Sequence, residues 1–270
     1  MADYLDVYIS RADAGRAKAL TGTTTPFTIT VRFTGGLTRT QQDAFVAAAD
    51  RWARVIVGDL PDVELDGEVI DDVLVLASGE DIDGEGNVLG MAGPTHVRVG
   101  GAPCRGEMRF DSADLAAMER DGILIDVITH EMGHVLGIGT LWEGLVQDAS
   151  GADPRYTGRV AMVEYGRLTG SNPEAVPVED EGGPGSRGSH WRESVFRNEL
   201  MSSGIGGVNN PISRLTVACL IDLGYQVDLD AAEPYTFPIP IEGAALTTRR
   251  LAGHFERPTR LRVSTEETVT

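Results

Sequence analysis

The chain has 270 residues, of which 41% are hydrophobic, and a formal net charge of −18. This size and composition allow a buried core that needs no disulfide framework, and the two cysteines form one bridge at most. The negative charge argues against nucleic acid or an anionic membrane as a partner, and no apolar run approaches the roughly 18 residues of a membrane span.

The N-terminal half predicts a mixed sheet backed by a helix. The expected strands are residues 27–33, 72–78 and 106–111, which alternate or are rich in β-branched residues. A helix is expected over 38–56, because Thr38 and Gln41 have capping-box spacing. Its apolar positions, on one helical face, are Phe45, Ala49, Trp52 and Ile56. A short helix is expected from about Ser112, after the third strand.

The C-terminal half is predicted to contain more loop. Residues 143–189 are rich in Gly, Pro, Asp and Glu, with one expected helix over 158–168. A second long helix is predicted within 211–227 and would end at Gly224. Cys219 falls on its apolar face, which predicts a buried thiol. After Asp230 the chain is Pro-rich and irregular.

The stretch DVITHEMGHVLGIG, residues 126–139, indicates a metal site. In a strand its two histidines would lie about 13 Å apart, too far for two rings that must each approach an ion to about 2.0–2.1 Å. In a helix they rise only about 6 Å and share one face, so His130 and His134 would clamp one zinc ion, and Gly137 would let the chain turn away. Glu131 would then take a proton from zinc-bound water and deliver it to the departing amine.

A third ligand is needed, because catalytic zinc usually has three protein ligands and one open position. In the compact metzincin pattern it would follow the second histidine by six residues, where this chain has Thr140, a poor ligand. The remaining candidates are Glu164, His190 and, with less support, His96 and His254. Glu164 would suit proteases that take a glutamate from a downstream helix. His190 is followed by Met201 in a Met-Ser-Ser-Gly stretch, which suits a methionine turn beneath the metal.

Three segments resemble the leishmanolysin family of metzincins: MRFDSADL at 108–115, THEMGHVLGIGTLW at 129–142 and SHWRESVFRNELMS at 189–202. That family has an insertion between the second and third histidines, and here 55 residues separate His134 from His190. The resemblance covers roughly residues 26–229. It implies a zinc endopeptidase in which His130, His134 and His190 bind one zinc ion. It further implies that Glu131 is the general base and acid and that Met201 is the Met-turn residue.

The resemblance also implies where substrates bind and where the protein acts. Residues 106–111 would be the edge strand on which an extended protein or peptide lies by backbone pairing, in contact with Glu107, Met108, Arg109 and Phe110. A secreted location is implied as well, although the N-terminal sequence shows no secretory leader. The protein is expected to be a monomer.

We therefore expect an α/β zincin fold of the metzincin type. Its mixed twisted sheet, backing helix and active-site helix would be joined to a smaller C-terminal subdomain. The expected parts are an N-terminal arm (1–25), the N-terminal subdomain (26–137), the C-terminal subdomain with the third ligand and the Met-turn (138–229) and an irregular tail (230–270).

The sequence holds two weaker signals, an acidic loop and Cys104. Asp81, Asp83 and Glu85 alternate in a Gly-rich loop, a spacing that can hold calcium, although a solvated acidic turn is the favoured interpretation. Cys104 is interpreted as a structural or free thiol rather than a cap on the zinc.

The sequence is also compatible with a zinc-stabilised binding or adhesion module, or with a zinc hydrolase of small molecules. Glu131 argues against the module, since a purely structural site needs no base.

Overall fold

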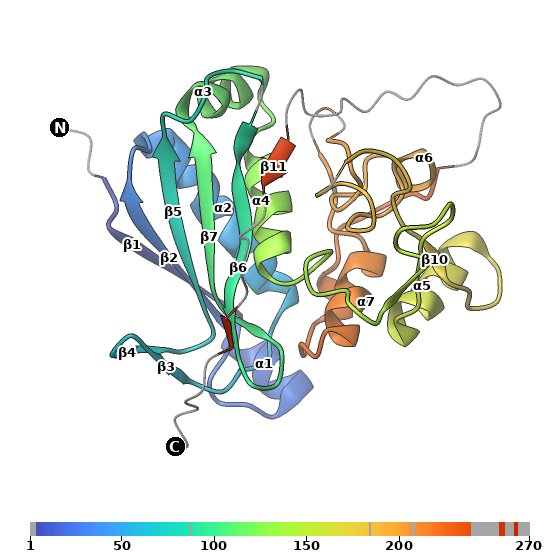
Figure 1. Cartoon of the computed structure of the whole chain (residues 1–270). Coiled ribbons are helices and arrows are strands. Elements are labelled where there is room, and N and C mark those ends of the chain that lie inside the picture. The colour runs from blue at the N-terminus through green and yellow to red at the C-terminus, as the bar shows by residue number, and fades with distance from the viewer. Residues whose placement is uncertain are drawn as a thin grey trace.

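The computed structural model describes residues 4–86, 88–183, 185–205, 207, 209–238, 254–256 and 262–263. The architecture is mixed α/β, with one large sheet on one side and a region of short helices, short strands and loops on the other (Figure 1). Among the described residues, no helix has both the length and the apolar character needed to cross a membrane.

The large sheet is mixed, as predicted. Its strands are β1 (Val7–Arg11), β2 (Thr28–Gly35), β5 (Val73–Glu80), β6 (Val88–Val97), β7 (Pro103–Asp111), β11 (His254–Glu256) and β12 (Arg262–Val263). They follow the order β1-β2-β5-β7-β6-β11, and β12 also pairs with β6. The central strands β2, β5 and β7 are parallel, whereas β1 and β6 run antiparallel to their neighbours β2 and β7. The three strands predicted from the sequence correspond to β2, β5 and β7.

The prediction that residues 106–111 form the edge of the sheet is wrong. These residues belong to β7, which lies between β5 and β6. The sequence conceals β6 because Gly90, Gly93 and Pro94 resemble loop residues. Gly90 is needed there, since a Cβ atom would lie 2.2 Å from the Arg109 carbonyl oxygen. Pro94 falls at a shift in the β6–β7 register, where a missing N–H disturbs the ladder least.

The substrate contacts predicted on β7 therefore lose their basis. Met108 and Phe110 are fully buried, and the Phe110 ring packs edge-on against Phe45 of the helix behind the sheet. Glu107 and Arg109 point to the opposite face and lie 3.8 Å apart as an ion pair. None of these four side chains lies on an open strand edge.

Two helices pack against one face of the sheet. Helix α2 (Arg39–Val55) has the predicted capping box between Thr38 and Gln41. Helix α4 (Leu124–Val135) is buried over most of its length and lies between the sheet and the C-terminal part of the molecule (Figure 1). The indole nitrogen of Trp52 on α2 donates to the Thr129 carbonyl on α4 (2.9 Å), which fixes the two helices against each other. Helix α3 (Ser112–Asp121) follows β7, as predicted.

The remaining elements are short. Near the N-terminus, α1 (Ala14–Thr21) follows β1, and both fall within the arm expected from the sequence. The hairpin β3 (Val63–Leu65) and β4 (Glu68–Ile70) precedes β5. The C-terminal part contains a small sheet and short helices: β8 (Val146–Gln147), β9 (Arg155–Tyr156), β10 (Val176–Pro177), α5 (Arg159–Thr169), α6 (Glu193–Phe196), α7 (Arg214–Asp222) and η1 (Leu229–Ala231).

The helix predicted around 158–168 is α5, but α7 is shorter than predicted. It spans the nine residues Arg214–Asp222 after its N-cap at Ser213, and Gly224 follows with a φ of +98°. The subdomain boundaries proposed from the sequence stay a prediction. In the expected tail, residues 239–253, 257–261 and 264–270 lie outside the described residues, whereas β11 and β12 pair with β6.

Both cysteines are free and buried. Burial raises the pKa of the Cys219 thiol to about 12, and its Sγ lies 3.4 Å from the Tyr156 hydroxyl. Burial also raises the pKa of Cys104. Raised thiol pKa values disfavour the thiolate that a metal ligand or nucleophile requires. The structure thus supports the interpretation of both cysteines as structural thiols.

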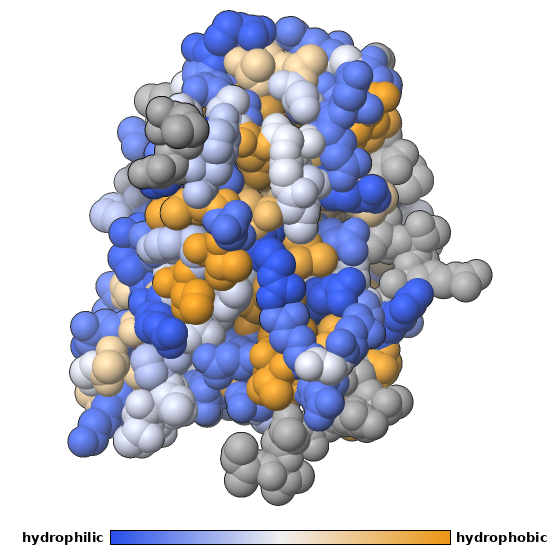
Figure 2. Space-filling model, turned by 90° about the vertical axis from the view of Figure 1, so that its left-hand side faces the viewer, coloured by the Kyte–Doolittle hydropathy of each residue, from blue (hydrophilic) through white to orange (hydrophobic). Residues whose placement is uncertain are grey.

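The surface on the β1 side of the molecule shows hydrophobic groups separated by hydrophilic ones (Figure 2). Val7 and Ile9 of β1 are 44% and 45% exposed. Exposed hydrophobic residues that do not join into one large patch are normal on a protein surface. The described residues of this face therefore form separate apolar groups.

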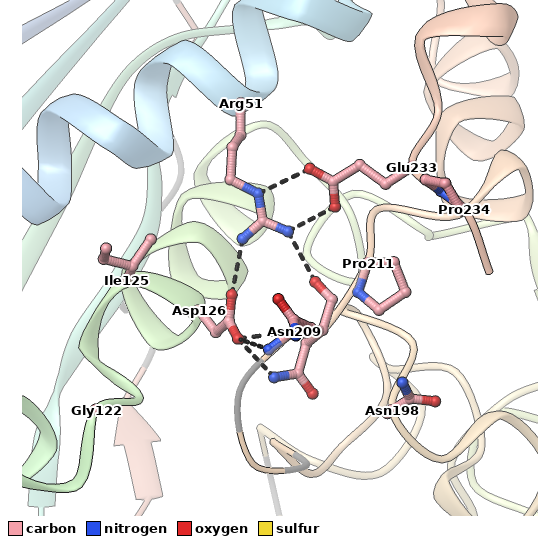
Figure 3. A pocket seen from close by; sticks show the side chains of 10 residues that line it. Arg51, Gly122, Ile125, Asp126, Asn198, Asn209, Pro211, Glu233 and Pro234 are labelled. Atoms are coloured by element: carbon pink, nitrogen blue, oxygen red, sulfur yellow. Dashed lines mark hydrogen bonds and ion pairs between the residues drawn. The ribbon is translucent and has the colours of Figure 1, made fainter.

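Arg51 joins α2 to the C-terminal part of the molecule (Figure 3). Its guanidinium donates to Asp126 at the start of α4 (2.8 Å), to both carboxylate oxygens of Glu233 (3.0 and 2.7 Å) and to the Asn210 carbonyl (2.8 Å). Asp126 also accepts from the Asn210 side chain at 2.8 Å. These groups line a cavity of about 690 Å³. Arg51 thus forms ion pairs with both carboxylates at this junction, Asp126 and Glu233.

The Arg51–Glu233 pair predicts a pH dependence of stability. Burial raises the pKa of Glu233, but hydrogen bonds from Arg51 and the Ile212 amide outweigh it and hold the pKa below the ordinary value of 4.5. A lowered folded-state pKa contributes stability that is present above pH 4.5 and is lost as the pH falls through the folded value. Glu233→Gln should cost about 1–3 kcal/mol at pH 7 and flatten the loss of stability below pH 4.5.

Urea unfolding at several pH values, followed by circular dichroism, measures both effects. Glu119→Gln is the control, because Glu119 is exposed. Acid slopes that are equal in Glu233→Gln and wild type would contradict the assignment of this pair.

Candidate metal centre

Three histidine side chains converge where α4 meets the C-terminal part of the molecule. His130 and His134 come from successive turns of α4, and His190 comes from the loop before α6. The Nε2 atoms of His130 and His134 are 3.1 Å apart, and each lies 3.1 or 3.0 Å from Nε2 of His190. All three side chains are buried. The structure therefore brings together the three histidines that the family resemblance implied.

The protonation of these rings is set by backbone carbonyls. Nδ1 of His130 lies 2.6 Å from the Leu200 oxygen, that of His134 lies 2.8 Å from the Ile138 oxygen, and that of His190 lies 2.9 Å from the Ser186 oxygen. A carbonyl oxygen only accepts, so each Nδ1 carries the proton and each Nε2 presents a lone pair.

This arrangement fits a zinc ion. Three lone pairs that face one another at about 3 Å repel unless a cation lies among them. Tetrahedral zinc with bonds of about 2.0–2.1 Å separates its nitrogen ligands by about 3.3–3.4 Å, close to the distances observed here. Carbonyl acceptors on the other ring nitrogen are also the usual outer partners of zinc-bound histidine. The donor set and its surroundings thus match a catalytic zinc site with three protein ligands.

Glu131 lies beside this cluster. One carboxylate oxygen is 3.9 Å from Nε2 of His130, and the side chain is buried. Because Glu131 directly follows His130 on α4, the helix fixes its carboxylate next to the centre without placing it among the three converging nitrogens. This position suits a proton acceptor for a water molecule at the metal.

Met201 packs against the backbone of α4 between the two helical histidines. A Cβ atom at Gly133 would lie 2.7 Å from the Met201 sulfur and 2.9 Å from the Trp52 ring. Gly133 therefore makes room for the fully buried Met201 side chain. The assignment of Met201 as the Met-turn residue stays a prediction.

The loop that carries His190 is held by two residues that were not singled out in the sequence. Gly139 has a φ of +72°, and a Cβ atom there would lie 1.9 Å from the Ser189 oxygen. The buried Glu179 pairs its backbone with His190 (2.9 Å), and its carboxylate accepts from the Glu193 amide (3.0 Å) and the Ser203 hydroxyl. The Gly-Ile-Gly sequence after the motif is a signal for Gly139. No pattern distinguishes Glu179 from the other acidic loop residues.

A second buried glutamate, Glu199, supports the segment that carries Met201. Burial raises the pKa of Glu199, and hydrogen bonds from Thr216, Ser213 and the Met201 amide act against that rise. The Met201 amide donates to it at 2.6 Å. The segment between His190 and Met201 is thus anchored from within the core.

The other candidates for the third ligand lie elsewhere. Glu164 is buried, but its carboxylate pairs with Arg167 and Arg214. His96 lies on β6, with Nδ1 3.1 Å from the Thr95 hydroxyl. The Thr140 hydroxyl donates to the His134 carbonyl (2.7 Å). For His254, only the backbone pairing of β11 with β6 is described. None of these belongs to the group formed by His130, His134 and His190.

The acidic loop proposed for calcium engages other parts of the protein. The Val88 amide donates to Asp83 (3.3 Å), and Glu85 pairs with Arg120 (3.3 Å). Among the described residues, the groups with three converging ligand atoms are the histidine group and Asp59, Asp71 and Asp72. Asp81, Asp83 and Glu85 form no such group, and calcium binding stays a prediction.

Comparison with known proteins gives one family. A profile of the family described as Leishmanolysin matches residues 61–240. The leishmanolysins of Leishmania donovani and Leishmania chagasi are 30% and 31% identical to this chain over 174 residues, which are 60% of this chain and 28% of theirs. A leishmanolysin homolog of Crithidia fasciculata is 31% identical over 149 residues, 51% of this chain and 22% of the homolog. The chain thus spans about a quarter of the length of these relatives.

The contact at Gly139 predicts a specific loss of metal binding. In Gly139→Ala the new methyl group must push the Ser189 carbonyl away, which displaces the adjacent His190. Gly144→Ala is the matched control, because Gly144 has a similar φ of +80° but a methyl group there would meet no atom within 4 Å. Both variants should lose about 1–2 kcal/mol of stability from the left-handed backbone.

Only Gly139→Ala should bind zinc at least about 10-fold more weakly, as measured by competition with a chromophoric chelator. Equal zinc affinities of the two variants would show that Gly139 does not position His190.

Proposed function

The chain belongs to the leishmanolysin family, and on that basis we propose that it is a zinc-dependent endopeptidase of the metzincin type that cleaves internal peptide bonds of extended protein or peptide substrates. The observation that carries this proposal is the convergence of three Nε2 atoms within 3.1 Å of one another, with the Glu131 carboxylate beside them. The match covers about a quarter of the length of the relatives, so endopeptidase activity is a proposal for this chain.

His130, His134 and His190 would hold the metal through their Nε2 atoms. Zinc bound there would polarise the scissile carbonyl and make a water molecule acidic enough to lose its proton near neutral pH. The three carbonyl groups that accept from the Nδ1 atoms keep the rings oriented, so the site is formed before a substrate arrives.

Glu131 would act as the general base and then as the general acid. Its carboxylate would take the proton of the attacking water and deliver it to the nitrogen of the departing amine. This role argues against a zinc-stabilised binding module, since such a module needs no carboxylate beside the metal. Cleavage of an unfolded protein distinguishes the endopeptidase from a hydrolase of small molecules.

The substrate backbone is proposed to pair with β6 rather than with β7. Strand β6 lies outside β7 and packs next to α4, which carries two of the histidines. Its outer edge already pairs with β11 and β12, both in parallel orientation. That pairing supports the ability of the edge to bind an extended chain. A substrate bound along this edge would take the place of β11 and β12.

The role of Glu131 predicts a loss of cleavage without a loss of metal. Glu131→Gln should retain zinc, because its side chain is not one of the three ligands, and should cleave an unfolded protein about 10²–10⁴-fold more slowly than wild type. Zinc content and cleavage are measured in parallel on both proteins. A wild type that binds zinc but does not cut would favour the binding module. Equal cleavage by the two proteins would exclude Glu131 as the base.

The proposed use of the β6 edge predicts an effect of β11 on KM. Phe255→Pro removes a backbone N–H from β11 and should weaken its pairing with β6, so an unfolded substrate should bind with a lower KM at unchanged kcat. Phe255→Ala keeps the N–H and serves as the control. If the two variants have the same KM as wild type, substrates do not compete with β11 for this edge.

A further inference from the structure

Glu199 is a fully buried carboxylate in the segment that leads to Met201. It accepts hydrogen bonds from the Met201 amide (2.6 Å), from the amide and the hydroxyl of Ser213 (3.2 and 2.7 Å) and from the Thr216 hydroxyl. Among the residues that the structure describes, no arginine, lysine or histidine forms an ion pair with it. Burying a carboxylate that only neutral donors balance costs free energy of folding. The groups that donate to Glu199 are in turn held in fixed positions by it.

The first chain of hydrogen bonds from Glu199 leads to His130 through a single peptide group. The Met201 N–H donates to the Glu199 carboxylate, and the Leu200 carbonyl of the same peptide group accepts from Nδ1 of His130 (2.6 Å). Hydrogen bonds in series polarise one another, so a carboxylate on the N–H side makes the carbonyl a better acceptor. The His130 ring is thereby oriented and its Nε2 becomes a stronger electron donor to a metal.

The second chain leads to the residue next to His190. The Thr216 hydroxyl donates to Glu199 and accepts from the indole nitrogen of Trp191 (2.8 Å). The Trp191 amide donates to the Met201 carbonyl (2.9 Å). Trp191 is fully buried and directly follows His190. Glu199 therefore also fixes the backbone from which His190 extends.

We propose that Glu199 is a positioning residue of the metal centre, which sets the orientation of His130 through the Leu200–Met201 peptide group and the place of His190 through Thr216 and Trp191. This inference deepens the proposed function and rests on it for the identity of the metal. It does not require that the protein cleave peptides, because its direct consequence is the affinity and geometry of metal binding.

A glutamine cannot replace Glu199 without losing one of its two hydrogen bonds from backbone amides. One carboxylate oxygen accepts from the Met201 amide, and the other accepts from the Ser213 amide. Glutamine has one acceptor oxygen and one NH₂ group. In either orientation its NH₂ group faces a backbone N–H, so one anchor is lost although the side chain keeps its size.

Glu164 provides the matched control. It is another buried glutamate, but its carboxylate pairs with Arg167 and Arg214 on α5 and α7. Glu164→Gln therefore removes a buried carboxylate whose hydrogen bonds do not lead to the histidines. Both variants should unfold at lower temperature than wild type.

The experiment measures zinc affinity by chelator competition, the visible absorption of the cobalt-substituted protein and the melting temperature. Glu199→Gln should bind zinc about 10–100-fold more weakly and shift the cobalt absorption bands, whereas Glu164→Gln should keep wild-type affinity and bands. Wild-type zinc affinity and cobalt bands in Glu199→Gln, with a lowered melting temperature alone, would make Glu199 a purely structural residue and overturn the proposal.

A second pair of variants keeps the test decisive if Glu199→Gln does not fold. Thr216→Val removes the hydroxyl that joins Glu199 to Trp191, and Thr216→Ser retains it. The proposal expects weaker zinc binding in the first variant and recovery in the second, and equal affinities would contradict it. A wild type that binds zinc but cuts no protein would refute the endopeptidase and leave this inference supported by the affinities. A wild type that binds no zinc would overturn both.

Discussion

The structure depends on the requirement that three imidazole nitrogens, about 3 Å apart, all present lone pairs to one point. Each ring meets this requirement because its other nitrogen, Nδ1, keeps its proton and donates a hydrogen bond to a backbone carbonyl. These carbonyls belong to Leu200, Ile138 and Ser186, which lie in three separate segments. Three segments must therefore be placed accurately: the turn after α4, the loop that leads to His190 and the segment that leads to Met201. Ile138, Ser186 and Leu200 all lie in turns rather than in helices or strands.

Buried polar groups and glycines supply the accuracy that regular secondary structure does not. Glu179 and Glu199 bind backbone and hydroxyl donors on both sides of the turn at Met201. Gly133 allows Met201 to approach α4, and Gly139 allows the His190 loop to approach the turn after α4, more closely than any side chain would permit. Because these contacts are short and directional, they define one arrangement of the loops, whereas apolar packing alone tolerates several.

Local patterns predict the parts of the site that lie close together in the sequence. His130, Glu131 and His134 follow from helix geometry, and α2 follows from its capping box and apolar face. Spacing alone does not distinguish His190 from Glu164 as the third ligand, because 55 residues separate His134 from His190. The family resemblance is needed for that choice. Strand β6 was missed because its glycines are required by contact with β7. The burial of Glu179 and Glu199 depends on tertiary contacts, for which a single sequence holds no periodic signal.

Three buried glutamates show how surroundings, rather than residue type, assign a role. Glu164 forms ion pairs with two arginines, Arg167 and Arg214, so its carboxylate joins α5 to α7 and takes no part in the metal centre. Glu199 faces four fixed donors, so its protonation would disrupt the hydrogen bonds that hold Met201 and Thr216. Glu131 alone among the three lies beside the histidine cluster, 3.9 Å from Nε2 of His130. Its position next to the converging nitrogens therefore makes it the one buried glutamate of the three that suits the proposed role of general base and acid.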